Sequence, residues 1–194
     1  MLGLMRRMAV AVVSTMVLVV GGVAAVRAQG DGRGHHETDG VRGKAGALIR
    51  AVQQSTERYK DVAAAEAEGY GLMFGCVSGP DQGAMGLHYV NFPLVQDITL
   101  DPAKPEIVIY EPLPNGRKRL VGADFLVFAA DWHAKHAETP KVMGQLMHLI
   151  ESPNRYGLPA FYTLHVWAWK ESPAGPFVNW HPTVSCANFD DPND

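Results

Sequence analysis

The chain has 194 residues, about the length of one domain. It carries 17 basic and 20 acidic residues, a formal net charge of −3, and 47% of its residues are hydrophobic. These values are typical of a globular protein and exclude a disordered chain, a collagen and a multi-spanning membrane protein. The slight excess of acidic residues also argues against nucleic-acid binding, because neutralising phosphates requires a basic surface.

Residues 1–28 have the pattern of a secretory signal peptide. Two arginines precede an uncharged, apolar stretch from Met8 to Val26, and a cleavage site follows at Ala28. A retained membrane anchor is the alternative, because about 19 uncharged residues can span a bilayer. We expect cleavage, and therefore a protein exported to the periplasm or the extracellular space that has no membrane attachment after cleavage.

Composition divides the remainder into three segments. Residues 29–43 are Gly-rich and polar without periodicity, which predicts a flexible leader. Residues 44–187 contain all the patterned sequence and are expected to form a single α+β domain. Residues 188–194 are expected to form an acidic tail.

Residues 44–68 predict an amphipathic helix. Apolar side chains such as Leu48, Val52 and Val62 recur at three- and four-residue intervals, which aligns them on one face. Gly69 supplies a stop signal. The apolar stripe requires a partner surface, and we expect this helix to cover a sheet.

After Gly71 the pattern changes to short β-type runs separated by Gly and Pro. One helix followed by antiparallel strands indicates an α+β fold, with the N-terminal helix packed on an antiparallel sheet or a partly open β-barrel. The predicted strands are residues 86–91, 107–111, 119–129, 161–169 and 183–186, and residues 141–150 fit either a helix or a strand.

The two cysteines, Cys76 and Cys186, lie near opposite ends of the patterned sequence. In an oxidising compartment an isolated pair is most simply a disulfide. The alternative is a thiolate metal or redox site, but no Cys-x-x-Cys is present. We therefore predict a Cys76–Cys186 disulfide.

Histidine is the main candidate for chemistry, because no serine lies in a Gly-x-Ser-x-Gly context. Side chains alternate along residues 161–169, so His165 shares a face with aromatic residues, where a polar ring needs a partner. His88 shares a face with Gly86 and Val90, and the neighbouring glycine leaves room for a ligand to approach.

Two carboxylates also lie in apolar surroundings. Glu111 ends the run from Ile107 to Tyr110, and Asp124 lies within the run from Leu120 to Leu126. A carboxylate in so apolar a run must be paired, protonated or bound to a cation.

These residues suggest a transition-metal site on the sheet. We predict His88 and His165 as nitrogen ligands, Glu111 as the oxygen ligand and His148 as a fourth ligand. Imidazoles with one carboxylate suit zinc, copper, iron or nickel. An open coordination position would permit catalysis, although the sequence identifies neither a reaction nor a substrate.

Three alternatives remain open. Each histidine could instead donate to a backbone carbonyl within the core. The chain could be a metal-free module that binds a small organic ligand in an aromatic pocket, or an interaction domain for an envelope partner. The aromatic residues considered for that pocket are Tyr89, Tyr110, Trp167 and Trp169.

Four motifs resemble those of a group of exported bacterial proteins. They are Met85–Asn91 (MGLHYVN), Pro105–Pro112 (PEIVIYEP), Leu164–Lys170 (LHVWAWK) and Pro182–Cys186 (PTVSC). The resemblance covers most of residues 50–187 and implies export, a shared fold and a role for His88, Glu111 and His165. The chain departs from the group at Glu171–Pro173 and at His181, where asparagine is usual. The resemblance implies no reaction.

Overall fold

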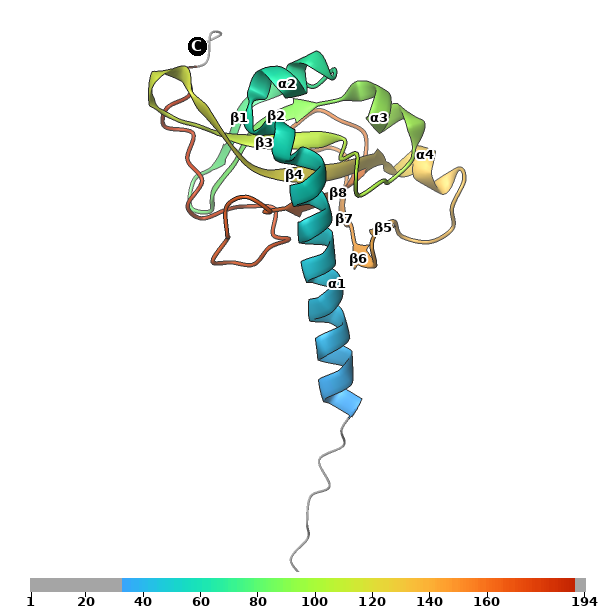
Figure 1. Cartoon of the computed structure of the whole chain (residues 1–194). Coiled ribbons are helices and arrows are strands. Elements are labelled where there is room, and N and C mark those ends of the chain that lie inside the picture. Colours follow the sequence, from blue (N-terminus) through green and yellow to red (C-terminus); the bar gives the residue numbers. More distant parts are fainter. Residues whose placement is uncertain (1–32, 191–194) are drawn as a thin grey trace, which may run out of the picture. The chain divides into compact units, whose positions relative to one another are not determined.

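A computed structural model of the chain describes residues 33–190. The predicted signal peptide, residues 29–32 of the leader and the last four residues of the tail lie outside the described residues. Within them, a mixed helix and strand fold is built on an antiparallel sheet that curls into a half-barrel (Figure 1). The α+β prediction is therefore confirmed.

Helices lead into the sheet from the N-terminal side. α1 begins at Arg33, earlier than the predicted start at residue 44, so residues 33–43 of the expected leader are helical. The Asp61 side chain accepts a hydrogen bond from the amide of Ala63 and so caps the short helix that follows. The helical elements are α1 (Arg33–Thr56), the 3₁₀ turn η1 (Glu57–Lys60) and α2 (Val62–Ala67).

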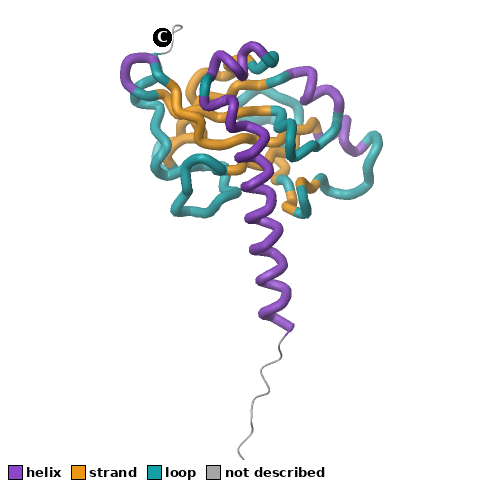
Figure 2. The backbone as a smooth tube through the Cα atoms, in the orientation of Figure 1, coloured by secondary structure: helices purple, strands orange, loops and turns teal. Residues whose placement is uncertain are grey.

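Six strands form the main sheet in the order β1-β2-β3-β4-β8-β7, and every neighbouring pair is antiparallel. Figure 2 shows α1 crossing these strands. The strands are β1 (Gly71–Gly79), β2 (Gly83–Val90), β3 (Ile107–Pro112), β4 (Lys118–Phe128), β7 (His148–Ile150) and β8 (Phe161–Val166).

The remaining elements connect these strands. Residues 141–150, which fitted either a helix or a strand, form a small hairpin followed by β7. Residues 183–186 were predicted as a strand but form none. The connecting elements are α3 (Phe92–Asp97), η2 (Pro114–Gly116), α4 (Ala129–His133), β5 (Lys141–Val142) and β6 (Gln145–Leu146). Among the described residues, no helix has the length and hydropathy that a membrane crossing needs.

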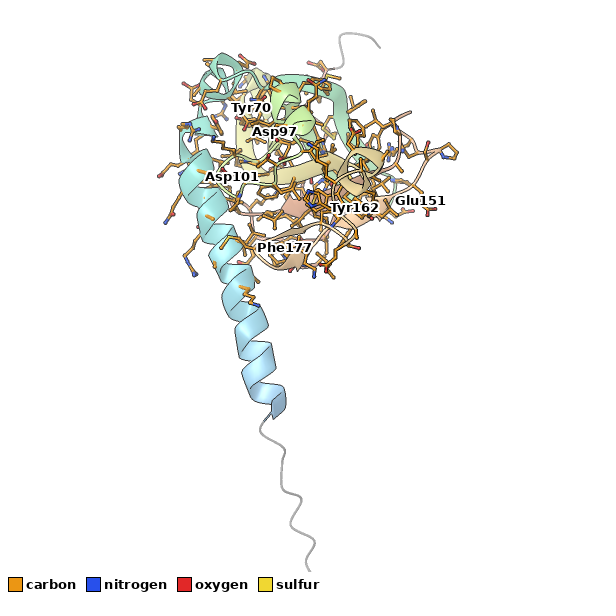
Figure 3. The ribbon with its side chains drawn as sticks, turned by 90° about the vertical axis from the view of Figure 1, so that its right-hand side faces the viewer. Tyr70, Asp97, Asp101, Glu151, Tyr162 and Phe177 are labelled. Atoms are coloured by element: carbon orange, nitrogen blue, oxygen red, sulfur yellow. A yellow bond between two sulfur atoms is a disulfide. The ribbon has the colours of Figure 1, made fainter. Side chains whose placement is uncertain are left out.

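The two faces of the sheet have different neighbours. On the helix face, Leu48 and Val52 of α1 pack against Phe125 of β4 and Leu164 of β8, and all four are fully buried. The segment after α3 joins this layer, because Leu100 packs against it (Figure 3 labels Asp101 beside α1). This face is a continuous hydrophobic core.

The opposite face, which we call the pocket face, combines apolar and polar side chains. Ile107, Leu126 and Phe161 contribute to its hydrophobic cluster. His88, Asp124 and His165 alternate along their strands with residues of the helix face. The sheet therefore separates a largely apolar core from a face that also carries buried polar and ionisable groups.

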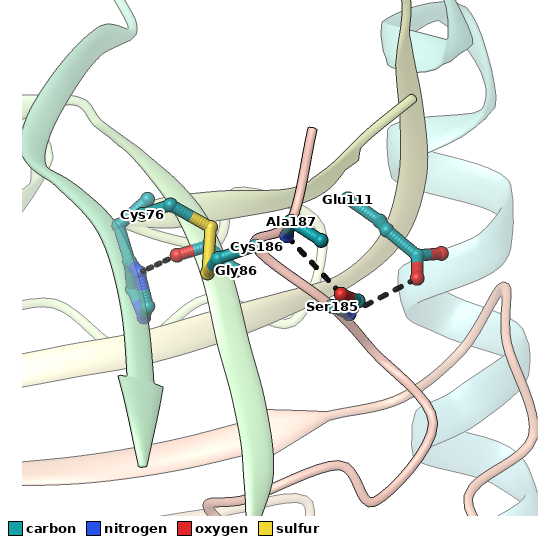
Figure 4. The surroundings of a disulfide bond; sticks show 7 residues. Cys76, Gly86, Glu111, Ser185, Cys186 and Ala187 are labelled. Atoms are coloured by element: carbon teal, nitrogen blue, oxygen red, sulfur yellow. Dashed lines mark hydrogen bonds between the residues drawn. A yellow bond between two sulfur atoms is a disulfide. The ribbon is translucent and has the colours of Figure 1, made fainter. Parts of the chain in front are cut away.

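The predicted disulfide is present. Cys76 of β1 is bonded to Cys186, with Cα atoms 5.7 Å apart and a sequence separation of 110 residues. The bond fastens the outer strand β1 to the C-terminal segment (Figure 4). A disulfide is consistent with an oxidising compartment.

Candidate metal centre

Strand register brings two predicted ligands together. β4 and β8 pair so that Asp124 lies opposite His165, and β2 carries His88 on the same face. The His88 and His165 ring centroids are 5.7 Å apart at an interplanar angle of 79°. One ligand atom from each of His88, Asp124 and His165 lies within 4.8 Å of the others. These three residues, which we call the metal cluster, could therefore hold a metal ion.

The metal cluster is deeply buried. His88 is 7% exposed, and Asp124 and His165 are each 2% exposed. A zinc ion with bonds of about 2.0–2.2 Å holds tetrahedral ligands roughly 3.5 Å apart, so the three side chains must close by about an ångström to bind one.

The backbone fixes the tautomer of His88. Its Nδ1 donates a hydrogen bond to the Gly86 carbonyl at 3.2 Å, which leaves Nε2 with its lone pair free for a metal. Gly86 itself has φ +93°, and a Cβ there would lie 2.6 Å from the Tyr110 carbonyl. The room beside this glycine is therefore occupied by the neighbouring strand β3 rather than by a ligand.

His165 has no such support. Both of its ring nitrogens are buried, and neither makes a hydrogen bond of normal geometry among the described residues, although the Asn179 side chain lies close enough to act on the ring. Its Nδ1 lies 3.6 Å from Asp124 Oδ1, beyond hydrogen-bond length. An unsatisfied buried polar atom costs about 1–3 kcal/mol, and two on one ring call for a further binding partner.

Neutral donors hold Asp124. Its Oδ1 accepts hydrogen bonds from the Thr163 hydroxyl at 2.7 Å and the Leu164 amide at 3.0 Å. Burial raises the pKa of Asp124 to about 6, and these hydrogen bonds only partly oppose that shift. Burial also lowers the pKa of His88 to about 4 and that of His165 to about 3. At neutral pH the metal cluster is therefore two neutral imidazoles and one carboxylate.

Glu111 lies elsewhere, in what we call the Glu111 cluster. It accepts hydrogen bonds from Arg119 and Lys170, the latter at 3.0 Å, and from the Ser185 amide at 3.2 Å (Figure 4). Burial alone would raise its pKa, but hydrogen bonds from the two cations hold the pKa below its ordinary value. Glu111 lies two residues along β3 from Ile109, the residue opposite His88, and there it pairs with both cations.

His148 is at the edge of the sheet. It lies on β7 opposite Thr163, is exposed, and is not among the residues that could share an ion. Asp124, and not Glu111, is the carboxylate that lies beside the two imidazoles. In the sequence, the position of Asp124 within an apolar run indicated that it needs a partner. Glu111 shares that feature, and only the register of β4 against β8 distinguishes the two carboxylates.

A cavity of about 80 Å³ lies beside the metal cluster, whereas roughly 10–15 Å³ on this measure accommodates a water molecule. His88, Asp124 and His165 all line it, together with Asn179, whose buried Oδ1 has no hydrogen-bond partner among residues 33–190.

The aromatic residues considered for a pocket lie mostly elsewhere. Tyr89 and Tyr110 pack together on the other side of the sheet, with ring centroids 5.0 Å apart. The Trp169 indole donates to the Thr56 hydroxyl at 2.9 Å, and Trp167 stands beside His165. None of the four is among the described residues that line the cavity.

Comparisons of the chain with protein-family models, with curated proteins and with solved structures found no match. The site must therefore be interpreted from its own geometry.

Proposed function

We propose that this chain is an exported metalloprotein that binds one divalent transition-metal ion through His88, Asp124 and His165. The observation that carries the proposal is the unsatisfied His165 ring, buried beside a carboxylate and a second imidazole. Metal coordination would satisfy a nitrogen of that ring and pair the buried Asp124 charge at the same time.

The donor set fits first-row transition metals. Two imidazoles and one carboxylate form three-residue sites for zinc and for non-haem iron, and imidazole also suits copper and nickel. Three protein ligands leave at least one coordination position, and all three side chains line the cavity. An open position next to a cavity would permit binding or activation of a small molecule.

Separate observations support the part of the proposal that concerns export. The N-terminal pattern of charge and hydropathy is that of a signal peptide, and the Cys76–Cys186 disulfide suits an oxidising compartment. The resemblance in four motifs to exported bacterial proteins agrees with this assignment.

Metal analysis of the exported protein tests the proposal. We expect about one equivalent of a transition metal after purification without chelators, or after reconstitution with Zn²⁺ or Co²⁺. His165→Ala and His88→Ala should lose it, whereas His136→Ala, which changes an exposed histidine outside the cluster, should retain it. Failure of the wild-type protein to bind any first-row divalent metal would end the proposal.

The apolar lining of the cavity favours a second candidate, a metal-free module for a small organic ligand. Trp167 reports on this site because its ring centroid is 5.7 Å from that of His165. A change in tryptophan emission when an apolar ligand is added to metal-free protein would support the second candidate. An envelope interaction domain would instead require a partner that co-purifies with the protein.

A further inference from the structure

The cavity has a lining of mixed chemistry. The metal cluster supplies part of the lining together with Asn179, and most of the remaining wall is hydrocarbon. A molecule that fills this space therefore needs one polar group and an apolar body. Six of the apolar lining residues are Val77, Val95, Ile107, Leu126, Phe128 and Phe161.

The mouth of the cavity is also apolar. Phe74 and Phe92 line it and are 48% and 47% exposed, so their rings border both the cavity and solvent. Phe74 is placed by an irregularity in β1, where it and Gly75 have φ values of 62° and 60° between Met73 and Cys76. Bulges of this kind redirect side chains next to binding sites.

Charge determines which polar group fits. A divalent ion held by one carboxylate and two neutral imidazoles has a net charge of +1, and burying a net charge is costly. Among the described residues that line the cavity, Asp124 is the one acid and none is Lys or Arg. Glu106, another buried acid, accepts from the Leu126 amide at 3.1 Å and does not line the cavity.

From this charge balance we propose that the cavity binds small monoanionic molecules with an apolar body, namely short-chain or single-ring carboxylates. The carboxylate would coordinate the ion held by His88, Asp124 and His165, and the hydrocarbon would extend along the apolar wall toward Phe74. This inference rests on the proposed metal site, because without the ion Asp124 would repel the ligand's charge.

Cobalt-substituted protein provides the test, since its visible absorption responds to a new ligand on the metal. Acetate, butanoate and hexanoate are titrated into the Co²⁺ protein, with hexanamide as the neutral match for hexanoate. We expect affinity to rise by about fourfold for each CH₂ added. Hexanamide should bind at least about tenfold more weakly than hexanoate, because it leaves the net charge uncompensated.

Two variants locate the hydrocarbon. Phe74→Ala should weaken hexanoate binding by about fivefold and leave acetate binding unchanged, because only the longer chain reaches the mouth. Leu146→Ala removes a comparably exposed apolar side chain outside the cavity and should change neither affinity.

The possible failures can be told apart. Stoichiometric cobalt without a spectral response to hexanoate, or a response independent of chain length, would refute the carboxylate inference and leave the metal site standing. Equal hexanoate binding by metal-free protein, followed by tryptophan emission, would refute it in favour of a metal-free module. Failure to bind cobalt or any other divalent metal would remove the metal site and the inference together.

Discussion

Glu111 and Asp124 are both buried carboxylates on strands of one sheet, but their partners differ. Glu111 is matched by the side chains of Arg119 and Lys170 and by the Ser185 amide. Asp124 has a hydroxyl, a backbone amide and two neutral imidazoles around it.

This difference separates an anchor from a candidate ligand. Lys170, which bonds Glu111, also donates to the Thr183 carbonyl, so the Glu111 cluster fixes the C-terminal segment near the disulfide. The metal cluster has no cationic side chain of its own among the described residues. Apolar sequence around a carboxylate therefore indicates only that a partner exists, and the partner's identity decides the role.

The largest expected effect on the free energy of unfolding comes from removing the disulfide, which lies near the Glu111 cluster. Replacing both Cys76 and Cys186 by Ser should lower the free energy of unfolding by about 4–5 kcal/mol, because the bond closes a long loop. Urea unfolding measures the change. Metal content per folded molecule should stay the same, and its loss would show that the two regions are coupled.

Metal binding should depend on Asp124 and not on Glu111. Asp124→Asn should weaken binding by about hundredfold or more, since loss of even an outer-shell partner costs 10–100-fold. Glu111→Gln, the matched control, should keep the wild-type affinity within about threefold. Competition with a chromophoric chelator measures both, and the reverse pattern would restore Glu111 as the ligand.

Folding stability should show the opposite dependence. Glu111→Gln should lower the free energy of unfolding by about 2.5 kcal/mol, because it leaves Lys170 without its buried counter-charge, whereas half-exposed Arg119 contributes little. In metal-free protein, Asp124→Asn should change it by less than about 1 kcal/mol, since the amide oxygen still accepts from Leu164. A larger loss for Asp124→Asn would make that residue an anchor as well.

A third buried carboxylate, Glu106, has neither cations nor imidazoles, and burial raises its pKa to about 8. Its contribution to stability is fully present below the ordinary pKa of 4.5 and is lost as the pH rises toward 8, because the folded state must then bury a charge. From pH 5 to pH 7 the free energy of unfolding should fall by about 2 kcal/mol. One titrating group can change it by at most roughly 1.4 kcal/mol per pH unit.

Glu106→Gln should remove this pH dependence. Urea unfolding of metal-free protein at the two pH values makes the comparison between the variant and the wild type. Identical pH profiles would mean that Glu106 ionises as freely in the folded chain as in the unfolded one.

Much of the fold could be predicted from the sequence. Apolar runs bounded by Gly and Pro located β2, β3, β4 and β8 to within a few residues. β1 was not predicted, because the irregularity at Phe74 and Gly75 interrupts the alternation on which strand prediction depends. Glycines between residues 33 and 43 similarly obscured the start of α1.

The site could be predicted only in part. Alternation along two strands predicted the faces that His88 and His165 occupy, their convergence was a hypothesis, and Asp124 was noted as a carboxylate that needs a partner. Choosing between Asp124 and Glu111 requires the pairing of β4 with β8, which places Asp124 directly opposite His165. Interstrand register depends on contacts distant in sequence, and local patterns do not encode it.

Alternation along β4 and β8 has a consequence for how this scaffold can diversify. Phe125 and Leu164 support the helix, while their immediate neighbours Asp124 and His165 face the cavity. Substitutions at every second position can therefore change the lining of the cavity while the packing of the sheet against α1 stays intact. Variants that differ only at cavity-facing positions should therefore keep the helix-facing core unchanged.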